Sequence, residues 1–157
     1  MSLAKELVDA GIHFGHRSTH WNPKMAPYIF GKRNKIHIID VKETIKGLLL
    51  ARKYLTKVVA EGKDVLFVGT KRQAQDIIRE EAERAGQYYI QNRWLGGTLT
   101  NFRTIKQSID QLNKLEAQFE DGSINARPKK EVMLLEKQCG KLKANLGGIQ
   151  KMQRLPG

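Results

Sequence analysis

The segment at residues 64–69, Asp-Val-Leu-Phe-Val-Gly, restricts the possible folds of this chain more than any other. Its four consecutive apolar residues lie between turn-forming residues. A strand with one solvent-exposed face would instead alternate apolar and polar residues. Such a run is typical of a strand that is covered on both faces, as in a parallel sheet. We therefore predict a strand in the interior of a parallel sheet.

The sequence before this strand has the pattern of a hairpin followed by a helix. Residues 28–39 alternate as two short strands around a turn, with Ile36–Ile39 as the second strand. Asp40 follows, with Glu43 three residues further on, which is the capping-box pattern of a helix start. An amphipathic helix is predicted from there to the region of residue 62.

The sequence after this strand repeats the alternation of helix and strand. Thr70 and Gln73 form a second capping box, and an apolar stripe follows it up to residue 86. Residues 87–90 then have the pattern of a short strand. The order strand–helix–strand–helix–strand over residues 35–91 predicts a right-handed βαβαβ unit, the core of a Rossmann-like, doubly wound α/β domain with a parallel sheet.

Beyond residue 100 the apolar spacing becomes that of a coiled coil. The two predicted stripes are Phe102, Ile105, Ile109, Leu112 and Phe119, and then Val132, Leu135, Cys139, Leu142, Leu146 and Ile149. Because turn-forming residues separate them, they predict an antiparallel coiled-coil hairpin that projects about 30 Å as an arm. The chain then divides into an N-terminal extension with the start of the hairpin (residues 1–35), a sheet core (36–100), the arm (101–152) and a linker (153–157).

The balance of charges points to a polyanionic partner. The 157 residues include 28 Lys and Arg and 16 Asp and Glu, which gives a net charge of +12. The alternative is a basic surface that serves solubility alone. No apolar stretch approaches the ~20 residues that span a bilayer, and no secretory signal precedes the first helix, so no membrane partner is expected. The single cysteine fits a reducing, cytosolic compartment.

Nine side chains in the N-terminal segment, the strand-end loops and the start of the arm are candidates for contact with a polyanion, because a phosphate backbone can approach them there. They are His16, Arg17, Lys24, Lys32, Arg33, Lys71, Arg72, Arg93 and Arg103. Lys71 and Arg72 come where a strand runs into a helix, the position at which doubly wound folds bind phosphate. The alternative is that these are ordinary exposed cations. The glycines of residues 93–103 allow close approach to a partner, and Arg93 and Trp94 can pair with phosphates and stack on bases. The alternative is that Trp94 and Leu95 plug the base of the arm, and both hold if Trp94 lies in the core and Arg93 points outward.

Neither a metal site nor a catalytic site is favoured by the residue spacing. His13, His16 and His20 are weak metal candidates, since no helix fixes their geometry and no fourth ligand is evident. The chain has no dinucleotide-binding or P-loop glycine fingerprint and no paired nucleophile and base. Cys139 falls in the predicted apolar seam, where a thiol is inert. We therefore predict no catalysis and no cofactor.

Several blocks together resemble the bacterial-type second small-subunit ribosomal protein family. The blocks are residues 11–16, 21–25, 28–31, 33–34, 37–40, 67–71 and 93–102. The resemblance implies a Rossmann-like sheet with an inserted coiled-coil hairpin, ribosomal RNA as the main ligand, and neither catalysis nor a small-molecule substrate. It also implies a place on a cytoplasmic or organellar ribosome, near the largest small-subunit protein. The family continues past residue 157, so we expect the sheet core to be incomplete here.

Two other functions remain as alternatives. One is a nucleotide-binding enzyme with a Rossmann-like fold, against which the missing glycine fingerprint counts. The other is a protein-docking module that uses its coiled-coil arm to hold a partner.

Overall fold

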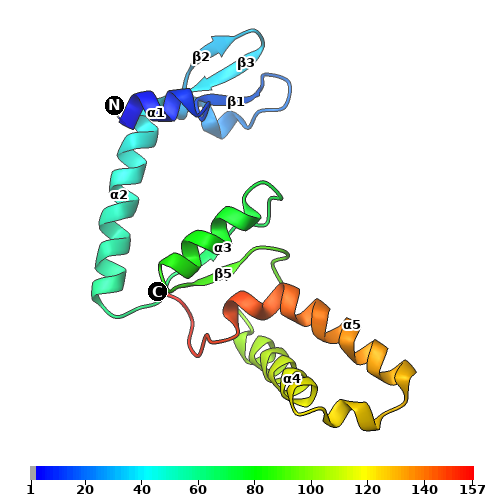
Figure 1. Cartoon of the computed structure of the whole chain (residues 1–157). Coiled ribbons are helices and arrows are strands. Elements are labelled where there is room, and N and C mark those ends of the chain that lie inside the picture. Colours follow the sequence, from blue (N-terminus) through cyan, green and yellow to red (C-terminus); the bar gives the residue numbers. More distant parts are fainter. Residues whose placement is uncertain (1–2) are drawn as a thin grey trace. The chain divides into compact units, whose positions relative to one another are not determined.

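A computed structural model describes residues 3–157 and shows a mixed α/β chain with two compact units, which divide between Lys57 and Val58 (Figure 1). No helix within residues 3–157 combines the length and apolar character needed to cross a membrane.

The first unit is built around a small antiparallel sheet. It contains α1 (Leu3–Asp9), β1 (Phe14–Arg17), the 3-10 helix η1 (Pro23–Tyr28), β2 (Ile29–Arg33), β3 (Ile36–Ile39) and most of α2 (Val41–Ala60). The strand order is β1-β3-β2, and both neighbours run antiparallel to β3. Asn34 and Lys35 have positive φ values of 49° and 62°, which suit the tight turn between β2 and β3. The predicted hairpin is thus confirmed.

The helix predicted to follow Asp40 is present, with a partial capping box. The Asp40 Oδ1 atom accepts a hydrogen bond of 2.8 Å from the backbone N–H of Lys42, as an N-cap does. Glu43 does not reach back to Asp40; it pairs with Lys46 at 2.5 Å. Most of the expected apolar stripe of α2 is exposed: Leu48, Leu49 and Leu55 are each more than 40% accessible, and Val58 is the buried residue of the helix.

The prediction that Ile36–Ile39 joins the parallel sheet is wrong. β3 is the central strand of the antiparallel sheet, with β1 on one edge and β2 on the other. Both rows of its backbone hydrogen-bonding groups are therefore used, and it has no free edge for β4. Of the predicted βαβαβ unit, the structure therefore contains one βαβ unit, in the second part of the chain.

That βαβ unit consists of β4 (Leu66–Val68), α3 (Gln75–Arg84) and β5 (Tyr88–Ile90). The strands pair in parallel, with Leu66 opposite Tyr88 and Val68 opposite Ile90. The capping box predicted at Thr70 is wrong, because α3 starts at Gln75 and no side chain caps it. β4 is also less covered than its sequence suggests, since Val68 is 47% exposed.

Two long helices follow and supply a large part of the core of the second unit. They are α4 (Phe102–Glu120) and α5 (Lys129–Leu146), with the 3-10 helix η2 (Ser123–Ala126) between them and η3 (Gly147–Ile149) after them. The largest buried cluster joins β5 to the near halves of both helices; it contains Ile90, Ile105, Ile109, Leu112, Leu146, Ile149 and Met152. The base of the helical pair is therefore part of the core.

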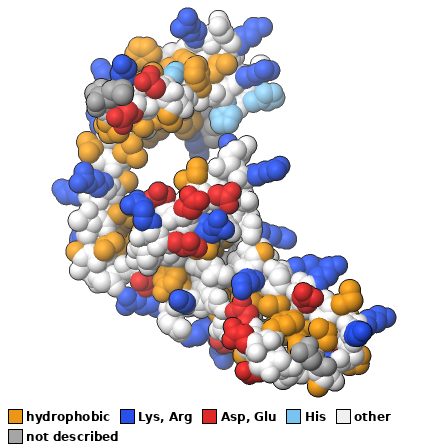
Figure 2. Space-filling model, viewed as in Figure 1, with side chains coloured by type: hydrophobic (Ala, Val, Ile, Leu, Met, Phe, Trp, Pro, Cys, Tyr) orange, Lys and Arg blue, Asp and Glu red, His pale blue; other side chains and the backbone are white. Residues whose placement is uncertain are grey.

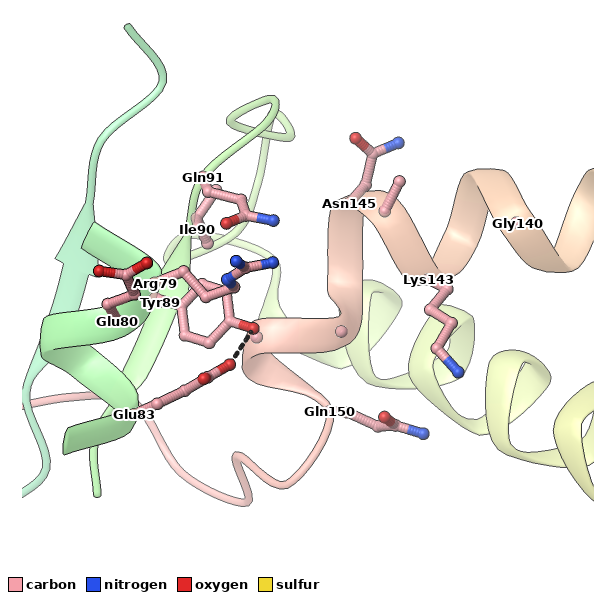
Figure 3. A pocket seen from close by; sticks show the side chains of 13 residues that line it. Arg79, Glu80, Glu83, Tyr89, Ile90, Gln91, Gly140, Lys143, Asn145 and Gln150 are labelled. Carbon is pink, nitrogen blue, oxygen red and sulfur yellow. Dashed lines mark hydrogen bonds between the residues drawn. The ribbon is translucent and has the colours of Figure 1, made fainter. Parts of the chain in front are cut away.

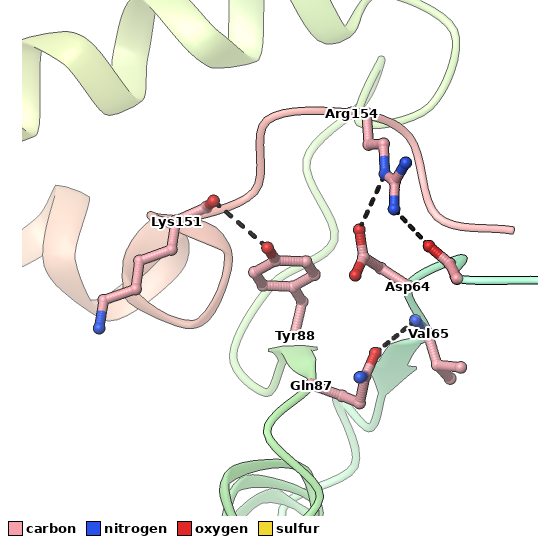
Figure 4. Close-up of polar contacts among 7 residues, drawn as sticks. Asp64, Val65, Gln87, Tyr88, Lys151 and Arg154 are labelled. Carbon is pink, nitrogen blue, oxygen red and sulfur yellow. Dashed lines mark hydrogen bonds and ion pairs between the residues drawn. The ribbon is translucent and has the colours of Figure 1, made fainter. Parts of the chain in front are cut away.

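The last residues lie against the start of the parallel sheet (Figure 4). The Tyr88 hydroxyl donates to the carbonyl oxygen of Lys151 at 3.3 Å, and the Arg154 Nε atom lies 3.3 Å from the Asp64 carboxylate. The backbone N–H of Gly157 donates to the carbonyl of Asp64 at 2.9 Å. Residues 151–157 thus connect the end of η3 to the beginning of β4.

Candidate nucleic-acid interface

The antiparallel sheet places two of the candidate arginines in one row. Arg17 on β1 and Arg33 on β2 are both register partners of Ile36 on the central strand. Residues in register on neighbouring strands lie on the same face, and strands are about 4.8 Å apart, so the two Cα atoms are separated by roughly 10 Å. Both side chains are exposed. Two cations at this spacing can contact neighbouring phosphates of a nucleic-acid backbone.

The other N-terminal candidates are exposed around the same sheet. His16 lies on β1, Lys32 on β2, and Lys24 in the first turn of η1. The backbone N–H of Lys24 donates to the Asn22 side chain at 3.0 Å, which orders this turn. Figure 2 shows Lys and Arg side chains standing out from the surface of the molecule.

Two exposed phenylalanines were missed by the sequence analysis. Phe14 and Phe30 are 61% and 79% exposed and line a cavity of about 360 Å³ together with Lys32 and Arg33. Phe14 lies between His13 and Gly15, and Phe30 lies between Ile29 and Gly31, so no polar alternation marks them as exposed. The local sequence does not reveal which face of the sheet lacks cover. Aromatic rings beside cations can take part in stacking as well as ionic contacts.

The candidates Lys71 and Arg72 lie in the connection between β4 and α3. Both are exposed, in a stretch of turns at residues 71–74 that precedes the first residue of α3. The Gln75 side chain donates to the carbonyl of Thr70 at 3.4 Å and closes this connection. The two cations therefore lie at the carboxyl end of a parallel strand, as predicted.

The loop at residues 91–101 presents Arg93 and Trp94 outward. Leu95 packs against the core cluster, whereas Trp94 is 38% exposed, so the expectation that Trp94 lies in the core is wrong. Arg103, in the first turn of α4, is exposed.

A second cavity, of about 550 Å³, lies between α3, β5 and the end of α5 (Figure 3). The Tyr89 hydroxyl donates to Glu83 at 3.0 Å, and burial together with this acidic neighbour raises the pKa of Tyr89. Arg79 and Lys143 are balanced by Glu80 and Glu83 in the lining. This cavity therefore offers no net positive field for a polyanion.

The histidines of the N-terminal segment do not form a metal-binding cluster. In the part of the chain that the structure describes, no three His, Cys, Asp or Glu side chains lie close enough to share an ion. The His13 ring lies against Phe14, with centroids 4.1 Å apart, and His37 stacks on Trp21 at 4.5 Å. The weak metal candidates His13, His16 and His20 are thus not brought together.

These features define a basic, mixed α/β protein with exposed cations on strands, loops and helices. The sequence model of the ribosomal protein S2 family matches residues 7–157, and the chain belongs to that family.

Three similar proteins carry the name small ribosomal subunit protein uS2. The relatives from Desulfovibrio desulfuricans and Lawsonia intracellularis are 56% and 57% identical over 152 residues, which is 97% of this chain. The one from Syntrophobacter fumaroxidans is 56% identical over 153 residues, or 98% of this chain. This chain spans 59%, 52% and 56% of their respective lengths.

Proposed function

We propose that this chain is a non-catalytic structural component of the small ribosomal subunit and that it binds ribosomal RNA. The observation that carries the proposal is the family match over residues 7–157, together with relatives named as small-subunit proteins. The net charge of +12 supports a polyanionic ligand. The protein would act on the ribosome in the cytoplasm, with neighbouring small-subunit proteins, including the largest one, as further partners.

The RNA contacts in this proposal are the nine exposed candidates named from the sequence. Arg17 and Arg33 would contact successive phosphates from one row of the sheet, and Lys71 and Arg72 would contact a phosphate at the end of β4. Structured RNA is recognised chiefly by shape and by its backbone, so these cations would position the protein with little readout of sequence.

The finer architecture belongs to the same proposal. The single parallel βαβ unit supports a Rossmann-like sheet core, and the contacts at the base of α4 and α5 support an inserted coiled-coil arm over residues 101–152. The segment at residues 1–35 would face RNA, and residues 153–157 would link the arm to the sheet.

Binding of small-subunit ribosomal RNA by matched double variants tests this proposal. Lys71→Ala with Arg72→Ala removes two unpaired exposed cations, whereas Lys46→Ala with Arg84→Ala removes two cations that pair with Glu43 and Glu81. The charge change is the same in both variants. We expect the first to weaken RNA binding at least tenfold and the second to have little effect. Circular dichroism should show that both remain folded.

Equal losses in the two variants would mean that total charge alone determines binding, which contradicts the proposed contacts. Failure of the parent chain to bind the RNA at low salt would contradict the proposed function itself.

A further inference from the structure

The loop at residues 91–101 is fastened at both sides of its exposed tryptophan. On one side, the Asn92 side-chain amide donates to the carbonyl of Ala144, in the last turn of α5, at 2.6 Å. On the other side, Leu95 packs on the core cluster and its carbonyl accepts two hydrogen bonds from Thr98, which is 1% exposed. Trp94 therefore lies between two fixed points.

The rest of the loop is held by its own backbone. Gly97 has a φ of +86°, a conformation that favours glycine, and its carbonyl accepts from the N–H of Asn101 at 2.7 Å. This turn leads directly into α4, so the loop has little freedom to fold the indole inward. Exposure of Trp94 is a consequence of these anchors.

The two tryptophans of the chain have different surroundings. Trp21 stacks on His37 at 4.5 Å with an interplanar angle of 28°. Within residues 3–157, no aromatic ring stacks on Trp94. The accessible part of an indole without a ring partner can stack on another flat ring.

The charged side chains of the loop and of the start of α4 indicate the kind of ring. Arg93 and Arg103 are exposed, and neither has an ion pair in the described part of the chain. The first turn of α4 carries Arg103 and no acidic residue. A flat ring flanked by phosphates meets both the aromatic and the cationic requirement, and that ligand is a nucleotide of an unpaired RNA strand.

We propose that Trp94 is a stacking platform for an unpaired nucleobase of RNA, with Arg93 and Arg103 on the adjoining phosphates. This proposal rests on the proposed RNA-binding function, and it adds that the loop at residues 91–101 recognises a single-stranded element. A base stacked on an aromatic side chain contributes enough that its loss weakens binding by about 5- to 100-fold.

Fluorescence of a single-tryptophan chain tests the proposal directly. Trp21→Phe keeps an aromatic ring against His37 and leaves Trp94 as the sole indole. We expect small-subunit ribosomal RNA to quench Trp94 emission at the concentrations at which it binds. We expect the same of a 12-nucleotide single-stranded RNA, which has about three-quarters of the length of the longest single strand that one binding domain covers. A duplex of the same length should bind through its phosphates with little quenching.

Substitutions in the same background provide the second measurement. Trp94→Leu should weaken binding of the single strand about 5- to 100-fold and leave binding of the duplex unchanged, whereas Trp94→Phe should restore most of the loss. Leu99→Ala is the matched control, because Leu99 is a 45% exposed apolar residue of the same loop. It should bind RNA as the parent does.

The outcomes separate the two proposals. Normal binding of ribosomal RNA with unchanged Trp94 emission, or equal effects of Trp94→Leu and Leu99→Ala, would overturn the stacking platform and leave the RNA-binding function standing. A change in Trp94 emission caused by other small-subunit proteins, and not by RNA, would overturn it in favour of a protein contact. Absence of RNA binding by the parent would overturn both.

Discussion

At the scale of single residues, Glu116 is the polar side chain that joins the two long helices. Its carboxylate lies 2.8 Å from the Lys143 ammonium on α5 and accepts a hydrogen bond of 2.7 Å from the Gln150 amide. Gln150 also donates to Asn113 at 2.7 Å. A partly buried charge is costly unless it is paired, and here Lys143 of α5 and Gln150, directly after η3, are the partners of Glu116.

This network makes the stability of the helical pair sensitive to acid. The hydrogen bonds from Lys143 and Gln150 lower the pKa of Glu116 from its ordinary value of 4.5. The resulting stabilisation is therefore fully present above that value and is lost as the pH falls through the lower pKa of the folded chain. Glu116→Gln should unfold more easily near neutral pH, and its stability should change less than that of the parent between about pH 6 and about pH 3.

Urea denaturation followed by circular dichroism across this pH range measures the effect. Asp110→Asn is the matched control, since Asp110 is an exposed carboxylate of the same helix without an ion pair among residues 3–157. Its pH dependence should match that of the parent. A Glu116→Gln chain with the parental pH dependence would show that the network contributes nothing to folding.

At the scale of elements, η3 packs closely on β5 in the second unit. A Cβ atom on Gly148 would overlap the backbone carbonyl and the ring of Tyr89, and a backbone atom cannot rotate away as a flexible side chain can. Glycine is therefore required for η3 to reach this position on the strand.

Gly148→Ala should destabilise the second unit by about 1–3 kcal/mol, because the chain must shift to accept the methyl group. Gly140→Ala is the matched control: it lies in α5, and nothing lies within 4 Å of its new Cβ atom. That substitution should be neutral or stabilising by up to about 1 kcal/mol, since alanine favours helix over glycine. The midpoint of urea unfolding distinguishes the two, and equal midpoints would contradict the close packing.

Most elements could be predicted from local patterns, but their pairing could not. The helices after residue 40 and residue 101, the hairpin around Asn34, and the strands at Leu66–Val68 and Tyr88–Ile90 all follow from spacing and turn chemistry. Ile36–Ile39 was assigned to the wrong sheet because the apolar content of a strand does not reveal its neighbours. That choice depends on β1, whose four residues give little strand signal.

The candidate site, like the fold, could be predicted from the sequence only in part. Exposure of the nine candidate side chains follows from their polar types, and all nine are exposed. The row that joins Arg17 to Arg33 requires knowledge of the register with Ile36, which no local pattern provides. The outward position of Trp94 likewise depends on distant anchors, namely the carbonyl of Ala144 and the core beneath Leu95.

At the scale of the whole molecule, the net charge of +12 predicts a strong dependence of RNA binding on salt. If about six phosphates are contacted, affinity should fall by about a thousandfold between about 50 and about 200 mM salt, because bound counterions are released. Filter binding of small-subunit ribosomal RNA over this range measures the slope. Affinity that is independent of salt would contradict an electrostatic interface.

The position of Gly148 at the root of the helical pair has a mechanical consequence. α5 has 18 residues and therefore extends about 27 Å from η3, so a rotation of about 10° at that root would carry its far end sideways by about 5 Å. The angle of α5 depends on how firmly its end at η3 is held, and there the backbone of Gly148 packs directly on the backbone of Tyr89. A side chain at position 148 would therefore be expected to displace the far end of α5, near Lys129, more than any residue beside η3.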